Sequence, residues 1–107
     1  MQVRGGDYVD FSSRDESLVV KLDGDLDHHL ANIIRIPIDQ KIDDATIKIV
    51  VFDFANVGFM DSSGIGLIMG RYKLISRKGG KIRAINLSPA IRRIFEISGL
   101  FKIVEVM

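Results

Sequence analysis

The sequence predicts one α/β domain, a mixed and mostly parallel β-sheet flanked by α-helices, in the order β-β-α-β-α-β-α-β. Three observations predict it. From residue 17 onward, β-rich runs alternate with segments of helical periodicity, which is typical of parallel strands joined by right-handed crossovers. Two β-rich runs at the start are placed to add an antiparallel edge. The 107 residues correspond to a single domain, 1–107, with no repeat or linker.

The first elements are two strands and a helix that contains a proline. Tyr8–Ser13 alternates weakly and is expected as an edge strand, and Ser17–Gly24 is a β-rich run that stops at its glycine. Asp27–Ile42 has helical spacing. Pro37 is expected to kink or shorten that helix, because proline lacks a backbone donor and crowds the preceding turn. The apolar stripe of the helix consists of Leu30, Ile33, Ile34 and Ile38.

A buried strand and a second helix occupy the middle of the chain. Ile47–Phe54 is a nearly unbroken apolar run, which predicts a central strand covered on both faces. A helix is expected from Ser62 to about Arg77. Glycine costs roughly 0.5–1 kcal/mol against alanine inside a helix, so we interpret Gly64, Gly66 and Gly70 as sites of close packing, with room for a partner's backbone near Gly64. The stripe of this helix consists of Ile65, Ile68, Met69, Tyr72 and Ile75.

The last third of the chain has the clearest helix signals. Lys81–Leu87 alternates as a strand. In the helix that follows, Ser88 can cap the N-terminus, Pro89 suits the first turn, and Gly99 suits the C-terminal stop. Lys102–Val106 is expected to add a final strand.

Composition excludes several classes of function. Hydrophobic residues make up 47% of the chain, enough for one core and too many for disorder. A net charge of +1 gives no case for nucleic acid or an anionic membrane as a direct partner. The chain has no cysteine, so disulfides and thiolate zinc sites are excluded. No apolar run approaches the roughly 20 residues that span a bilayer, and we expect a soluble, cytoplasmic protein.

Two polar loops are expected at the same edge of the sheet. Gly24–His29 follows one predicted parallel strand, and Met60–Gly64 follows the next strand along the chain. The loops after parallel strands open on the same side, which is where open α/β sheets place ligand and partner sites. The two loops are therefore predicted to lie together.

The serine pair in the second loop has two possible interpretations, a helix cap and a phosphorylation site. Either Ser62 or Ser63 can cap the helix, as can Asp61 before them, so the motif offers more caps than one helix needs. Equally, free N–H groups and the helix dipole favour an anion at this position, so a phosphate on Ser62 would be tolerated by the fold. The residues alone leave both readings open.

Catalytic and ligand-binding readings of the same loops are weaker. The glycines have the spacing G-x-G-x-x-x-G, which differs by one residue from the G-x-G-x-x-G fingerprint of dinucleotide-binding folds. They also follow the third predicted strand, whereas the fingerprint follows the first. Ser62, His28 and Asp25 or Asp27 supply the residue types of a hydrolase triad, but the serine is not in G-x-S-x-G. Asp25 and Asp27 could bind a metal ion together with His28 and His29. A solvated helix start that is rich in acidic residues explains the same four residues equally well.

The remaining charged and apolar residues suggest surface roles. Arg71–Lys73 and Ile91–Arg93 are expected as exposed helix faces. Leu100 and Phe101 follow a helix stop, and they are expected either to be partner contacts or to plug the sheet edge.

Three stretches in register resemble one family. They read "LDGDLDHH", "FMDSSGIGLIMGRYK" and "SPAIRRIFEISGLFKI". Together they resemble the anti-sigma factor antagonists with the STAS fold, most closely its sporulation members, from about Leu18 to Ile103. The chain departs from that pattern at Pro37, which lies in a helix that runs on in relatives, and at Met107, where those relatives continue into a further helix.

The resemblance implies a regulator without enzymatic activity or cofactor. Such proteins bind an anti-sigma factor that is also a serine kinase, displace the sigma factor, and are phosphorylated on the first serine after the aspartate, here Ser62. A serine phosphatase reverses the modification, and the free protein is expected to be a monomer. The resemblance implies a partner-binding surface of Asp25, Asp27, His28, Asp61, Ser62, Ser63 and Gly64. The alternatives are a STAS signalling scaffold, part of an anion transporter, or a small nucleotide- or anion-binding domain.

Overall fold

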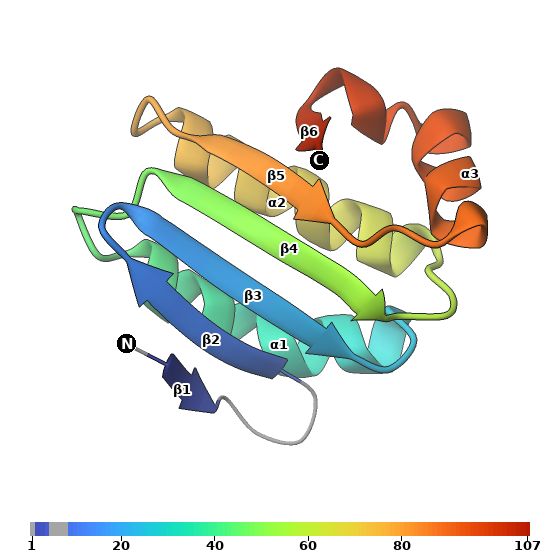
Figure 1. The fold of residues 1–107 in the computed structure, drawn as a ribbon, viewed down its shortest axis with the longest axis horizontal. Helices are drawn as coiled ribbons and strands as arrows, with labels where there is room; N and C mark the ends of the chain where they lie inside the picture. Colours follow the sequence, from blue (N-terminus) through green and yellow to red (C-terminus); the bar gives the residue numbers. More distant parts are fainter. Residues whose placement is uncertain (1, 5–8) are drawn as a thin grey trace.

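The computed structural model describes residues 2–4 and 9–107, which form one α/β domain (Figure 1). A six-stranded sheet contains the strands in sequence order, and its first two pairings are antiparallel while the other three are parallel. The fold class is confirmed, with one strand more than predicted at the N-terminus; Tyr8 lies outside the described residues. The strands are β1 (Gln2–Arg4), β2 (Val9–Arg14), β3 (Ser17–Asp23), β4 (Ile49–Asn56), β5 (Lys81–Ile85) and β6 (Val104–Val106).

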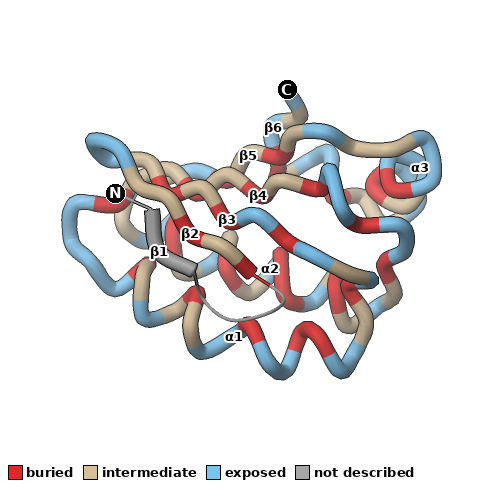
Figure 2. Tube along the Cα trace, turned by 60° about the horizontal axis from the view of Figure 1, so that its bottom comes forward, coloured by how far each residue is buried: buried red, intermediate tan, exposed pale blue. Residues whose placement is uncertain are grey.

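Two long helices cover one face of the sheet (Figure 1). Figure 2 shows the sheet above α1, with buried segments recurring along the helix. None of the helices in the described part of the chain has both the length and the apolar character needed to cross a membrane. The helices are α1 (His28–Ile42), α2 (Ser62–Ser76), α3 (Pro89–Ser98) and the short 3₁₀ helix η1 (Leu100–Lys102).

The central strand β4 is covered on one face only. Val50, Phe52 and Phe54 alternate along the strand and are at most 1% exposed, whereas Ile49 and Val51 between them are half-buried. The prediction that both faces are covered is therefore wrong. An apolar run predicts burial in general, but it does not tell on how many faces helices will pack.

Proline does not end α1. The helix continues past Pro37 to Ile42, and both Ile38 and Ile42 are at most 3% exposed in the core. The loss of one backbone bond at proline is offset by the burial of these side chains. Ile33, whose carbonyl Pro37 cannot bond, lies on the exposed side of the helix, contrary to its predicted place in the stripe. The buried residues of α1 are Leu30, Ala31, Ile34, Ile38 and Ile42.

The packing of α2 against α1 differs from the predicted stripe. Arg71, expected on an exposed face, is buried, and its Nε lies 2.8 Å from Asp39 Oδ1 of α1. Burial lowers the pKa of Arg71, Asp39 opposes that shift, and the positive charge of Arg35 adds to it. Met69, expected to be buried, is exposed. Apolar residues surround this helix on several sides, so their spacing alone could not decide which side meets α1. The buried residues of α2 are Gly64, Leu67, Ile68, Arg71 and Ile75.

The C-terminal elements follow the predicted signals. Ser88 Oγ accepts from Ile91 N at 3.2 Å, Pro89 opens α3, and Gly99 ends it with φ 80° and ψ 10°. Leu100 and Phe101 were expected either to contact a partner or to plug the sheet edge, and the two residues differ. Leu100 is fully buried, whereas Phe101 is 37% exposed and packs against Phe95 of α3. Arg92 and Arg93 are exposed as expected, but Ile91 is buried.

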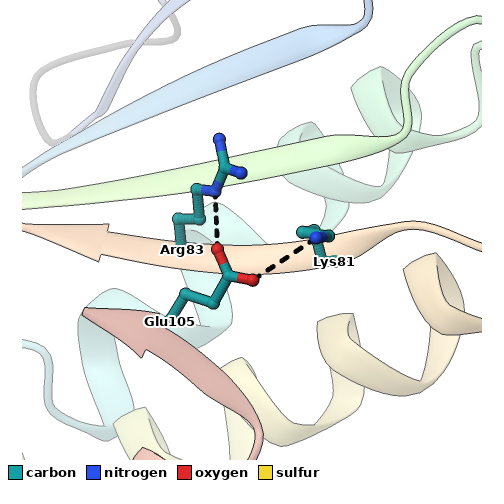
Figure 3. A network of polar contacts seen from close by, with 3 residues as sticks. All are labelled: Lys81, Arg83 and Glu105. Atoms are coloured by element: carbon teal, nitrogen blue, oxygen red, sulfur yellow. Dashed lines mark hydrogen bonds and ion pairs between the residues drawn. The ribbon is translucent and has the colours of Figure 1, made fainter. Parts of the chain in front are cut away.

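A carboxylate ties the short edge strand β6 to β5. Glu105 Oε1 lies 2.9 Å from Arg83 Nε, and Oε2 lies 3.4 Å from Lys81 Nζ (Figure 3). The hydrogen bond from Arg83 is the main reason that the pKa of Glu105 is lowered, followed by that from Lys81.

Candidate functional site

The two polar loops lie together at the C-terminal edge of the parallel strands, as predicted. Leu26 and Met60 form an isolated parallel bridge beyond the ends of β3 and β4. Leu26 N donates to Phe59 O at 2.9 Å, and Asp61 N donates to Leu26 O at 3.3 Å. This bridge holds the start of α1 against the start of α2.

The N-terminus of α2 is capped by an aspartate. Asp61 Oδ1 accepts from Ser63 N at 2.8 Å and from Gly64 N at 3.4 Å. Ser62 is the first residue of the helix, and its exposed hydroxyl has no hydrogen-bond partner among the described residues. The capping alternative is therefore wrong for both serines, because the carboxylate before them already satisfies the free backbone donors.

Ser63 faces the first helix. Its Oγ lies 3.5 Å from His28 Nδ1, at the outer limit of a hydrogen bond, and His28 Nε2 lies 3.2 Å from Asn32 Nδ2. The imidazole is thus directed at Ser63 and Asn32. The triad geometry considered for a hydrolase, with this histidine on Ser62, is not formed.

The glycines of α2 have different surroundings. A Cβ on Gly64 would lie 2.5 Å from Leu26 O and 2.6 Å from Met60 Cγ, so the close-packing prediction is right there. It is wrong for Gly66 and Gly70, where a Cβ would meet nothing within 4 Å. The prediction of room for a partner's backbone near Gly64 is wrong, because Leu26 and Met60 fill that space; the open space lies at Gly66 and Gly70. All three glycines sit within the helix, so they form no glycine-rich phosphate loop.

The acidic residues around the serines are partly structural. Asp27 caps α1, with its Oδ1 accepting from Leu30 N at 3.0 Å, in the same way that Asp61 caps α2. Asp25 is exposed beside Gly58. Among the described residues, no group of three or more His, Cys, Asp or Glu side chains could hold a metal ion, so the metal reading gains no support.

A groove between α1 and α2, with Ser63 in its lining, was not predicted. It has a volume of about 270 Å³. Its signal in the sequence was the pair Gly66 and Gly70, one helical turn apart, which we had assigned to packing. The groove is lined by His28, Ala31, Asn32, Arg35, Ser63, Gly66, Leu67, Gly70 and Arg71.

Comparison with known proteins identifies relatives along most of the chain. Residues 8–107 match the STAS domain model. An anti-sigma F factor antagonist of Paenibacillus polymyxa is 43% identical over 89 residues, which cover 83% of this chain and 76% of that protein. The structure of the anti-sigma factor antagonist SpoIIAA in its unphosphorylated form is similar, with a TM-score of 0.75, 30% identity, and coverage of 92% of this chain and 86% of that one. The Bacillus cell fate determinant SpoIIAA in its phosphorylated form has a TM-score of 0.73, 32% identity, and coverage of 92% and 90%.

Proposed function

The chain belongs to the STAS-domain family of anti-sigma factor antagonists, and we propose that its unphosphorylated form binds an anti-sigma factor serine kinase and releases the sigma factor. Phosphorylation of Ser62 by that kinase switches binding off. One observation carries the proposal: Asp61 caps α2, and the Ser62 hydroxyl is left exposed and unbonded among the described residues. A kinase substrate needs such a free hydroxyl.

The surroundings of Ser62 suit a protein interface. Asp25 and His28 are exposed, His28 contacts the neighbouring Ser63, and Asp27 holds the start of α1 in place. The contact of Ser63 with His28 helps to orient the neighbouring Ser62. Gly64 packs closely on Leu26 and so fixes the position of the helix start that carries both serines. In this proposal the partner lies across both helix starts.

The switch is electrostatic. A phosphate on Ser62 adds about −1.5 to −2 charges next to Asp61. The N-terminus of α2 favours that anion, so the domain stays folded. A partner that covers Ser62 would have to bury the added charge, which disfavours the complex strongly. The similar folds of the unphosphorylated and phosphorylated relatives support a switch that acts by charge and not by refolding.

Phosphosite mapping by mass spectrometry tests the proposal. The protein is incubated with ATP and the anti-sigma factor kinase of the same organism, with Ser62→Ala and Ser63→Ala as matched controls. We expect one phosphate on Ser62, absent only in Ser62→Ala. Modification that is lost in Ser63→Ala but retained in Ser62→Ala would move the site by one residue.

The same experiment separates the rival classes. Removal of the phosphate by a serine phosphatase of that organism completes the proposed cycle. The identity of the released sigma factor then decides whether the protein controls sporulation. No phosphate, together with no complex in ADP, would favour a STAS signalling scaffold. Direct titration with ATP or GTP tests the small nucleotide-binding alternative.

A further inference from the structure

We infer that the groove between α1 and α2 receives an acidic side chain of the anti-sigma factor, held between Arg35 and Arg71. The inference rests on the proposed function and adds a second contact to it, beyond Ser62. It is carried by the empty space over two glycines, the charge of the groove, and the groove's position.

The space over α2 has no use within the chain. Gly66 and Gly70 each cost roughly 0.5–1 kcal/mol of helix stability relative to alanine. Gly64 has a reason to be glycine, because a Cβ there would collide with Leu26 O, but no atom lies within 4 Å of a Cβ on the other two. Glycines that the fold does not need leave room for something that approaches from outside.

The groove is positively charged. The Arg71 side chain is only 10% exposed, with Nε beside Asp39 Oδ1 at 2.8 Å and Nη1 near Leu67 O at 3.4 Å. Arg35 lies near enough for its charge to lower the pKa of Arg71. None of the described residues that line the groove is acidic. A carboxylate beside both guanidinium groups would relieve the repulsion between them, and guanidinium groups bind carboxylates through charge-assisted hydrogen bonds.

Size and position identify the occupant. The volume of about 270 Å³ lies below the roughly 300–1,000 Å³ of small-molecule sites, so the groove suits one side chain better than a nucleotide. His28 and Ser63 line the groove and also lie at the two helix starts, so a protein that covers Ser62 reaches the groove as well. Asp25 and Asp61 do not line the groove but belong to the two polar loops beside it. A complementary partner surface therefore pairs basic groups with these acids and an acid with the groove.

Calorimetric titration with the anti-sigma factor of the same organism tests the contact. Arg35→Glu reverses an exposed charge, and Gly70→Leu fills the groove with a better helix former, so both proteins should fold. We expect each to bind roughly tenfold more weakly, or worse, than the unmodified protein. The matched control is Arg92→Glu, which reverses an exposed arginine on α3 and should change the affinity by less than about twofold.

The outcomes distinguish this inference from the proposed function. Unchanged affinity in Arg35→Glu and Gly70→Leu overturns the groove contact while leaving the switch intact, provided that Ser62→Asp still weakens binding. An equal loss in Arg92→Glu would show a general charge effect and would also overturn it. If the unmodified protein does not bind the anti-sigma factor, the proposed function and this inference both fail.

Rescue and amide spectra identify the group that enters the groove. An Asp→Arg or Glu→Arg change in the anti-sigma factor should restore binding to Arg35→Glu. The amide signals of Gly66 and Gly70 should shift when the anti-sigma factor is added and stay unchanged with inorganic phosphate or ATP. Shifts with phosphate or ATP alone, and none with the protein, would assign the groove to a small anion and overturn the proposal.

Discussion

At the scale of single residues, three neighbouring side chains at the start of α2 have three separate tasks. Asp61 caps the helix, Ser62 is exposed, and Ser63 contacts His28. Serine and aspartate are both good caps, so the sequence left the cap undecided. The bridge between Leu26 and Met60 decides it, because it sets where the helix begins and so which side chain reaches the free donors.

The glycines of α2 allow a matched prediction at this scale. Gly64→Ala would place a Cβ 2.5 Å from the backbone oxygen of Leu26, so we expect a loss of about 1–3 kcal/mol in the free energy of unfolding. Gly66→Ala meets no atom within 4 Å and should instead gain about 0.5–1 kcal/mol. Urea denaturation of the two proteins measures the difference. Equal effects would contradict the surroundings described for these positions.

At the scale of elements, tertiary packing determines how far a helix extends. Pro37 predicts a kinked or shortened α1, because proline disfavours the interior of a helix. Ile38 and Ile42 nevertheless continue the buried stripe into the core, and the helix runs to Ile42. Burial of two large side chains, at about 1.5–3 kcal/mol each, outweighs one proline.

Removal of this proline should therefore stabilise the protein. Pro37→Ala restores a backbone donor to the carbonyl of Ile33 without changing the buried stripe. We expect an increase of about 1–3 kcal/mol in the free energy of unfolding, measured by urea denaturation. Pro89→Ala is the matched control, since proline is favourable in the first turn of α3 and its removal should not stabilise. A decrease on Pro37→Ala would show that the ring packs usefully where it is.

The attachment of β6 should depend on pH through Glu105. Its pKa lies below the usual 4.5, so its bond to Arg83 contributes stability above about pH 4.5, and that contribution is lost as the pH falls through the lowered value. We expect Glu105→Gln to have a lower urea midpoint than the unmodified protein at pH 6. The difference should disappear well below pH 4.5. A difference that stays constant with pH would assign it to packing.

At the scale of the whole molecule, the parallel sheet assembles the site. β3 and β4 run parallel, so residues far apart in the sequence meet beyond their carboxyl ends. This brings His28 to Ser63 and Asp25 to Gly58, in the segment that leads to α2. The proposed switch needs no movement of the fold, because one added charge on this shared edge changes what a partner must bury.

A charged variant tests this idea directly. Ser62→Asp should keep its melting temperature within a few degrees, since an acid at a helix start is worth about 0.3–1 kcal/mol in its favour. It should bind the anti-sigma factor at least roughly tenfold more weakly. A complete switch from mostly bound to mostly free requires a difference of about 5.5 kcal/mol in binding free energy. Ser62→Asn, similar in size and uncharged, is the control and should bind more tightly than Ser62→Asp. Tight binding by Ser62→Asp in calorimetry would contradict the charge switch.

The sequence by itself determined the order of the elements from β2 onward, the caps of α3, and the meeting of the two polar loops. These features follow from local signals and from the rule that loops after parallel strands share an edge. Tertiary structure decided which residue caps α2, which side of α2 is buried, and that Arg71 lies between the helices. It also decided that Gly66 and Gly70 border a groove. Each of these depends on how two elements pack against each other, and that contact is formed by residues distant in the chain.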